Sequence, residues 1–189
     1  MSLINKEISE FKVNGFDPVK NKFIEVSKKD ILGKWNVFFF YPGDFTFVCP
    51  TELEDLALLF DEFEKENVNI YTISTDSHFV HKAWYDVSNA LKGLKYTMLS
   101  DKTHELSNDF EVLTDEDGMS ERGTFIINPK GKVASYEISS GGVGRNASEL
   151  LRRIKAIKYT YENGSEVCPA RWKPNDETIK PGIDMVGKI

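Results

Sequence analysis

The sequence predicts an α/β domain with a mixed central β-sheet flanked by helices, followed by an extended C-terminal arm. Apolar strand-like runs alternate with amphipathic helical segments, a pattern typical of parallel strands joined by helices. Two later strands flank a Pro-Gly turn, which adds an antiparallel hairpin to that sheet. Beyond residue 162 the regular pattern stops. We therefore expect one domain over residues 1–162 and an arm over residues 163–189.

The first half of the chain predicts a hairpin or irregular strands, two buried strands and two helices. In residues 11–26, strand-like residues are interrupted by turn residues. This pattern predicts a hairpin or irregular strands. Residues 35–41 are nearly all apolar, as in a strand covered on both faces. Apolar residues then recur at helical spacing over residues 51–67. A second buried strand over 69–75 precedes a helix over 78–89, which Ser77 is suited to cap.

The second half continues this alternation and then changes character. A strand over residues 96–99 and a helix over 102–110 precede the hairpin of strands 123–127 and 132–138. A long helix is expected over residues 146–161. The arm contains Gly and Pro residues that prevent regular helix, together with Trp172 and several aliphatic residues. Such an arm is expected to dock on another surface.

Composition restricts the class of protein. The chain has 189 residues, with 40% hydrophobic and 29% charged residues, as in an ordinary soluble globular domain. The formal net charge of −6 leaves no basic excess to neutralise phosphates, so nucleic acid is not an expected partner. No run approaches the roughly 20 apolar residues of a membrane span. The N-terminus lacks the pattern of a secretory signal, so a cytoplasmic location is the default expectation.

One of the two cysteines lies at an unusual position. Cys49 falls where the strand 35–41 has ended and the helix 51–67 begins. The unpaired N–H groups of a helix start favour negative charge, so a thiol placed there loses its proton more readily. Pro50 suits the first helical position, and Glu52 could reach back to the helix start as half of a capping box. The alternative is a packed, inert cysteine before an ordinary helix.

The histidines do not predict a metal site. His78, His81 and His104 lack finger-like spacing from either cysteine. His78 and His81 are three residues apart and share a helix face, but no carboxylate partner is evident from the sequence. They are therefore interpreted as a polar face, and Trp84 on the same helix as a packing residue.

Four segments together resemble the typical two-cysteine peroxiredoxins. The spacing Pro42-x-x-x-Thr46-x-x-Cys49 matches that family's signature, and the resemblance covers nearly the whole chain. Residues 121–129 look like the strand that carries the family's active-site arginine, here Arg122. Residues 166–172 look like its resolving-cysteine segment, and residues 184–189 are similar to the ending of bacterial members. The resemblance implies a thioredoxin-like fold of the peroxiredoxin type.

The resemblance also implies a role for each matching residue. Cys49 would be the peroxidatic nucleophile, which is oxidised by hydrogen peroxide or an organic hydroperoxide to a sulfenic acid. Arg122 would stabilise the thiolate and polarise the peroxide, Thr46 would hydrogen-bond the peroxide, and Pro42 would exclude water. Cys168 would resolve the sulfenic acid as an intersubunit disulfide. Two further charged residues remain open: Glu52 and Arg145 are either supports of this site or a helix cap and a solvated charge.

The same resemblance implies partners rather than a bound cofactor. No cofactor-binding motif is found in the chain, and Gly141-Gly142-Val143-Gly144 lacks the context of a phosphate loop. Reducing equivalents from NADH or NADPH would arrive through a flavoprotein disulfide reductase that carries FAD, or through a thioredoxin. A homodimer is implied, and rings of five dimers are frequent in the family. The role implied is antioxidant defence.

Sensitivity to overoxidation can also be predicted from this resemblance. Oxidation-sensitive members carry a Gly-Gly-Leu-Gly motif before the strand that corresponds to residues 96–99. Residues 90–95 lack it, and the chain ends without the Tyr-Phe helix of those members. We therefore expect Cys49 to resist conversion to sulfinic acid.

Three other functions are compatible with parts of the pattern. A thioredoxin-like disulfide exchanger fits the strand order but needs Cys-x-x-Cys, and the position three after Cys49 is Glu52. A cysteine hydrolase needs a histidine base beside its nucleophile, and none of the three histidines is marked for that role. A holdase chaperone would need an exposed apolar signature that the sequence does not show.

Overall fold

The computed structural model describes residues 2–188, so Met1 and Ile189, at the ends of the two expected segments, lie outside the described residues. The chain divides into two compact units, Met1–Asn146 and Ala147–Ile189. This division falls before the last long helix, whereas the sequence placed it after that helix, at residue 162. Each unit is described by itself below.

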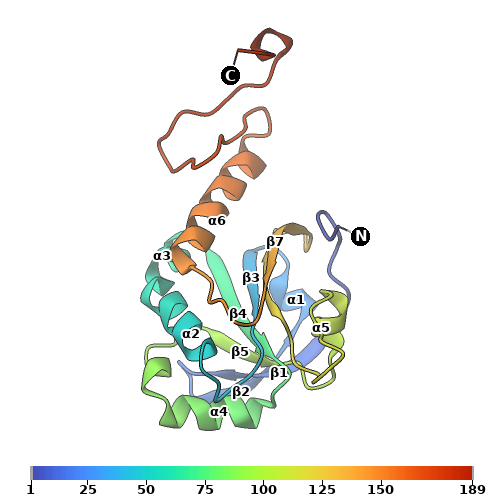
Figure 1. The fold of residues 1–189 in the computed structure, drawn as a ribbon, viewed down its shortest axis with the longest axis vertical. Helices are drawn as coiled ribbons and strands as arrows, with labels where there is room; N and C mark the ends of the chain where they lie inside the picture. Colours follow the sequence, from blue (N-terminus) through green and yellow to red (C-terminus); the bar gives the residue numbers. More distant parts are fainter. Residues whose placement is uncertain (1, 189) are drawn as a thin grey trace. The chain divides into compact units, whose positions relative to one another are not determined.

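The first unit is built on a seven-stranded sheet in the order β2-β1-β5-β4-β3-β6-β7 (Figure 1). Strands β3, β4 and β5 are parallel, and the remaining neighbours pair antiparallel. The mixed sheet expected from the sequence is therefore confirmed. The strands are β1 (Lys12–Asp17), β2 (Lys22–Ser27), β3 (Trp35–Phe40), β4 (Val68–Ser74), β5 (Thr97–Ser100), β6 (Arg122–Ile127) and β7 (Val133–Ser139).

Helices flank this sheet on both sides, with α2 and α4 on one side and α1 and α5 on the other (Figure 1). The first unit contains α1 (Lys28–Ile31), α2 (Cys49–Leu58), α3 (Phe60–Lys65), α4 (His78–Val87), the 3₁₀ turn η1 (Asn89–Leu91) and α5 (Glu105–Asp109). The Ser77 hydroxyl accepts a hydrogen bond from the Val80 amide at 3.3 Å, so the predicted cap of α4 is confirmed.

The prediction of one helix over residues 51–67 is wrong in two respects. It begins at Cys49, and it is interrupted at Leu59, whose φ of −103° and ψ of 5° leave the helical region. The apolar spacing of Leu53, Leu56, Phe60 and Phe63 continues across the interruption, so periodicity could not reveal it.

Alternation along the strands assigns side chains to the two faces of the sheet. Phe38 and Phe40 of β3 join Phe125 of β6 in the main apolar core, to which α1 and α5 contribute Ile31 and Leu106. The intervening positions of these strands point to the opposite face, where α2 and α4 lie. Arg122 is three positions before Phe125, so this parity directs it toward the α2 side of the sheet.

The second unit consists of α6 (Ala147–Glu162) and the arm that follows it, with a short 3₁₀ turn η2 (Ile183–Met185). Trp172 is buried and packs its ring against Tyr159 of α6, at 5.1 Å between centroids. Val167 and Ile179 pair as an isolated antiparallel bridge. The first part of the arm is therefore docked on α6, as expected for a segment with apolar residues. Among residues 2–188, no helix is long and apolar enough to cross a membrane.

Candidate active site

Cys49 is the first residue of α2 and is completely buried. Its position follows from the sequence before it: β3 ends at Phe40, and residues 41–48 form the loop that carries the chain to the helix start. The helix N-terminus places unpaired N–H groups and the positive end of the helix dipole near the sulfur. Burial removes the screening of water, so neighbouring charges act strongly on this thiol.

Arg122, at the start of β6, reaches the sulfur directly. Its Nη1 donates to Cys49 Sγ at 3.3 Å and to the Glu52 carboxylate at 2.7 Å. Its Nε donates to the Gly141 carbonyl at 2.8 Å, which fixes the guanidinium plane from a third direction. Only 4% of Arg122 is exposed, so this arginine is not a surface residue at the strand end.

Glu52 joins this arginine to a second one. The carboxylate accepts four N–H bonds, one from Arg122 and three from the backbone amide, Nε and Nη2 of Arg145. Glu52 is 2% exposed, and its bonds go to arginines rather than to the start of α2, so the capping interpretation is wrong. Arg145 also lies over the Phe39 ring, with 3.4 Å from Cζ to the centroid, and is not a solvated charge.

Two guanidiniums share one carboxylate in this buried cluster. Arg122 and Arg145 both pair with Glu52, and Arg122 also donates to Cys49 Sγ. Burial lowers the pKa of Arg122, but hydrogen bonds and attraction from Cys49 and Glu52 outweigh this and leave its pKa raised. For Arg145, burial prevails over the attraction of Glu52 and the pKa is lowered. The arrangement therefore places a charged N–H donor directly against the Cys49 sulfur.

The loop before Cys49 carries two more of the predicted residues. Pro42 and Thr46 are both half-buried. The Thr46 hydroxyl donates its proton to the Gly43 carbonyl at 2.8 Å. Because that proton is used, the hydroxyl oxygen can offer only its lone pairs to a bound reactant. Thr46 is thus oriented as an acceptor, not as the donor that an oxyanion-type role would require.

Cys168 belongs to the second unit, in the docked part of the arm. It is half-buried, and its Sγ lies 3.7 Å from the Ala156 carbonyl of α6, the geometry of a weak S–H hydrogen bond. Burial raises the pKa of the Cys168 thiol, helped by the negative charge of Glu166 and opposed by Arg152. Both cysteines are free thiols in the described chain.

The face of α4 that carries His81 is not the polar face expected from the sequence. His81 is fully buried, and its Nδ1 lies 2.8 Å from the Asp44 carboxylate, so it does have a carboxylate partner. Tyr41 donates to the same carboxylate at 2.7 Å. Trp84 packs against the Tyr41 and Phe45 rings, in keeping with its predicted packing role. His81 and Trp84, three residues apart on one helix face, could have indicated that this face is buried.

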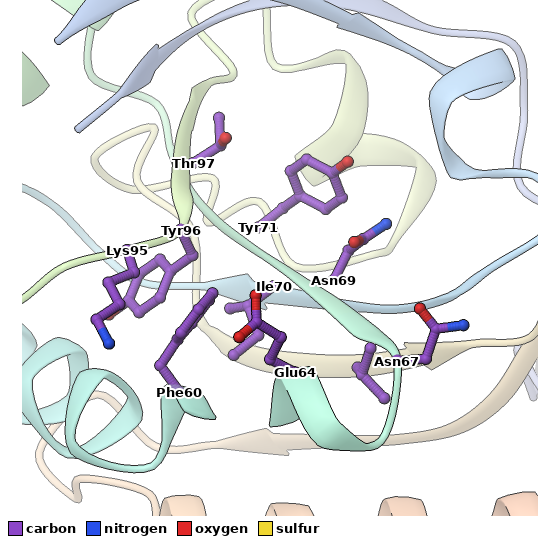
Figure 2. A pocket seen from close by; sticks show the side chains of 10 residues that line it. Phe60, Glu64, Asn67, Asn69, Ile70, Tyr71, Lys95, Tyr96 and Thr97 are labelled. Atoms are coloured by element: carbon purple, nitrogen blue, oxygen red, sulfur yellow. The ribbon is translucent and has the colours of Figure 1, made fainter. Parts of the chain in front are cut away.

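A separate surface pocket lies between α3 and the neighbouring strands β4 and β5. Figure 2 shows Phe60, Glu64, Lys95 and Tyr96 around it, and it includes none of the seven predicted site residues. Lys95 is already paired with Asp61 at 2.7 Å. This pocket is therefore distinct from the thiol site.

The fold and the thiol site together define the class of protein: a thioredoxin-like chain whose buried cysteine is held by an arginine, a thiol peroxidase of the peroxiredoxin type. The AhpC/TSA family model matches residues 4–136, and the chain belongs to that family. A second model, the C-terminal domain of 1-Cys peroxiredoxin, matches residues 156–186.

Relatives and solved structures agree with this assignment. The chain is 50% identical to alkyl hydroperoxide reductase C of Staphylococcus saprophyticus and 51% identical to that of Staphylococcus aureus, over the full length of each pair. The crystal structure of Enterococcus faecalis AhpC matches with a TM-score of 0.86 and 44% identity, covering 89% of this chain and all of that one. Reduced 2-Cys peroxiredoxin of Plasmodium vivax matches with a TM-score of 0.92 and 35% identity, covering 97% and 96%.

These findings confirm the fold and the general activity predicted from the sequence. The chain is a peroxide-reducing thiol peroxidase, an oxidoreductase that is itself reduced by a partner protein. The match to alkyl hydroperoxide reductase C of Staphylococcus saprophyticus spans the whole chain, including the ending that resembles bacterial members of the family.

Proposed function

We propose that Cys49 is the peroxidatic nucleophile of this enzyme. Its thiolate attacks the terminal oxygen of hydrogen peroxide or an organic hydroperoxide. The S–O bond forms as the O–O bond breaks, the sulfur is oxidised to a sulfenic acid, and the leaving oxygen takes a proton to become water or an alcohol. The observation that carries this proposal is the 3.3 Å contact from Arg122 Nη1 to Cys49 Sγ, inside a buried cluster of two arginines and one glutamate.

The remaining site residues act on the peroxide or on Arg122. Arg122 attracts the peroxide oxygens as well as the sulfur, because its guanidinium has more than one N–H group. Thr46 accepts a hydrogen bond from the peroxide O–H and so aligns the O–O bond with the sulfur. Pro42 covers this loop against water. Glu52 and Arg145 hold Arg122 in the orientation that serves both tasks.

Cys168 resolves the oxidised enzyme. Its thiol attacks the sulfenic sulfur of Cys49 in a second copy of the chain, water leaves, and an intersubunit disulfide forms. Two observations support this step. Cys168 lies in a different compact unit from Cys49, and a solved structure that covers 97% of this chain is described as a 2-Cys peroxiredoxin. The raised pKa of Cys168 keeps this thiol protonated at neutral pH. Because the thiolate is the nucleophile, peroxide then reacts with Cys49 rather than with Cys168.

The assembly and the reductant are also proposals. Strand β7 lies at one edge of the sheet in the described chain, so another copy could extend the sheet there and form the homodimer. Five such dimers would form the ring. Reduction would come from NADH or NADPH through an FAD-containing flavoprotein reductase of the alkyl hydroperoxide reductase system, or from a thioredoxin, in the cytoplasm.

Rapid mixing of the reduced protein with peroxide tests the role of Cys49. One equivalent of peroxide should be consumed in a fast phase that is lost in Cys49→Ser and retained in Cys168→Ser. Peroxide consumption that survives Cys49→Ser would refute the assignment.

Electrophoresis without reductant tests the resolving step. Oxidised wild-type protein should run as a disulfide-linked dimer, and Cys168→Ser should run as a monomer. A monomeric oxidised wild type would show that Cys168 does not bridge two copies.

Mass spectrometry after turnover in excess peroxide tests the expected resistance to overoxidation. Most Cys49 should remain free of sulfinic acid while the reductant lasts. Rapid accumulation of the sulfinic form would overturn this part of the proposal.

A further inference from the structure

The loop that carries Pro42 and Thr46 rests on a buried polar cluster outside the arginine network. The cluster consists of Tyr41, Asp44 and His81. The Tyr41 hydroxyl donates to Asp44 Oδ1 at 2.7 Å, and Asp44 Oδ2 lies 2.8 Å from His81 Nδ1. The side chains of Asp44 and His81 are both 0% exposed, so water does not satisfy or screen them.

Hydrogen-bond geometry determines how many protons this cluster contains. His81 Nε2 faces the Leu99 carbonyl at 3.1 Å, and a carbonyl only accepts, so Nε2 carries a proton. Burial, reinforced by the charge of Asp44, raises the pKa of Tyr41 well above its ordinary value, so its hydroxyl remains a donor. One further proton must lie between Nδ1 and Oδ2, since two bare acceptors would repel at 2.8 Å. The histidine–aspartate pair is then neutral overall, whichever atom carries that proton.

The same aspartate is held through its backbone. The Asp44 amide donates to Asp76 Oδ2 at 2.8 Å, and Ser74 donates to the same oxygen at 2.9 Å. Asp76 follows β4, His81 belongs to α4 and the accepting carbonyl of Leu99 belongs to β5. Asp44 is therefore held directly by Tyr41, Asp76 and His81, and the Leu99 carbonyl of β5 holds His81 in turn.

The position of Asp44 determines the geometry of its neighbours. Gly43 precedes it and supplies the carbonyl that orients the Thr46 hydroxyl at 2.8 Å. Phe45 follows it with a φ of +57°, a left-handed conformation that is costly for an aromatic residue unless its surroundings impose it. Arg122 and Glu52 take no part in these contacts. The cluster can thus fix the peroxide-binding loop without acting on the charge of the sulfur.

We propose that Asp44 is a positioning residue, held by Tyr41 and His81 through one shared proton, and that it aligns Thr46 and Pro42 for the peroxide. The proposal deepens the function proposed above and rests on it. It separates two tasks of the site: the Asp44 cluster aligns the reactant, and the Arg122–Glu52–Arg145 cluster stabilises the thiolate.

A comparison of Asp44→Ala with Asp44→Asn tests this proposal. The asparagine amide can donate to His81 Nδ1 while its carbonyl accepts from Tyr41, so all hydrogen bonds of the cluster can persist without an acid. Alanine removes them. Tyr41→Phe is a milder variant for use if Asp44→Ala does not fold. Asn36→Ala is the matched control, because Asn36 is a fully buried polar residue at the far end of β3.

Two second-order rates are measured on each reduced variant, one with hydrogen peroxide and one with iodoacetamide. Iodoacetamide needs the thiolate but not an aligned O–O bond. In Asp44→Ala the peroxide rate should fall about 10- to 100-fold, the scale expected for misplaced reactants, while the alkylation rate stays near that of the wild type. Tyr41→Phe should show a smaller loss of the same kind. Asp44→Asn should keep most of the peroxide rate, and Asn36→Ala should change neither rate.

Three outcomes would overturn the positioning role. The first is a wild-type peroxide rate in Asp44→Ala and Tyr41→Phe. The second is a parallel fall of both rates, which indicates general damage. The third is an Asp44→Asn rate as low as that of Asp44→Ala, which shows that the hydrogen bonds do not suffice. Failure of the proposed function would look different, because the wild type itself would then not react with peroxide.

Discussion

Glu52 holds Arg122, which contacts the Cys49 sulfur, together with a second arginine, Arg145. Its carboxylate lies between Arg122 and Arg145, accepts hydrogen bonds from both, and is nearly inaccessible to water. A buried ion pair adds little net stability compared with an apolar replacement, but removal of one partner leaves charges without compensation. The consequences of changing Glu52 should therefore be large.

We predict that Glu52→Ala lowers the free energy of unfolding by about 3–5 kcal/mol, because two guanidiniums lose their buried counterion. The peroxide rate should fall as well, since Arg122 is no longer oriented toward Cys49. Denaturant unfolding and rapid mixing measure the two effects. Glu54→Ala is the matched control, because Glu54 is an exposed acidic residue on the same helix. Equal behaviour of the two variants would contradict this account.

Some site residues could be predicted from the sequence and others could not. The spacing of Pro42, Thr46 and Cys49 and the likeness of the segment around Arg122 identified the thiol site, and Arg122 does reach Cys49. Asp44 was not found, because an aspartate next to Pro-Gly is typical of a turn. Its partner His81 comes from another element, and only the folded chain brings the two within hydrogen-bonding distance.

Among the elements, β6 matters most for the active site, because its packing determines where Arg122 lies. Gly123 follows Arg122 directly, and its carbonyl accepts from Arg145 Nη1 at 2.9 Å. A Cβ at this position would lie 2.8 Å from Val112 Cγ1 and from Phe125 Cε2. Such distances require the strand or its neighbours to move, and β6 carries Arg122 with it.

We predict that Gly123→Ala costs about 1–3 kcal/mol of stability, as overpacking of a filled core does. It should also slow the reaction with peroxide, because the shift of β6 displaces Arg122 from Cys49. Gly93→Ala is the control, since a Cβ there meets nothing within 4 Å. Thermal unfolding and peroxide kinetics on both variants are the measurements. A stable and fully active Gly123→Ala would show that the strand accommodates the methyl group without moving Arg122.

The order of the elements was easier to predict than their ends. Strand β3 is nearly all apolar and β4 is mostly buried, and the assignment of both strands is confirmed. Helix α1 was missed because it has only four residues and no amphipathic period, although Ser27 and Asp30 form a capping box at its start. The break at Leu59 was missed for the opposite reason, because the apolar period persists through it.

For the whole molecule, the two compact units divide the two cysteines between them. The unit Met1–Asn146 contains Cys49 with Arg122, Glu52 and Arg145, so every residue of the proposed peroxide-reacting site except Cys168 lies within it. Cys168 belongs to Ala147–Ile189, which contains none of those groups. If the proposed roles hold, substitutions in one unit should alter the reaction with peroxide and substitutions in the other should alter resolution.

Buried tyrosines give the first unit a distinctive dependence on alkaline pH. Burial raises the pKa of Tyr41 and Tyr96 well above 10, and it raises the pKa of Tyr71 from 10.0 to about 12. In the unfolded chain the same phenols ionise near pH 10. The unfolded state therefore loses protons that the folded state retains, and the stability contributed below pH 10 is lost as the pH rises.

We predict that the free energy of unfolding falls between pH 10 and pH 12 by about 1.4 kcal/mol per pH unit for each of these tyrosines. Urea unfolding at stepped pH measures the slope, and ultraviolet absorbance of tyrosinate shows when each state ionises. Tyr71→Phe tests one residue. In this variant the free energy of unfolding should fall less steeply with pH than in the wild type, by the contribution of one tyrosine. An unchanged slope in Tyr71→Phe would mean that the Tyr71 phenol ionises as readily in the folded chain as in the unfolded one.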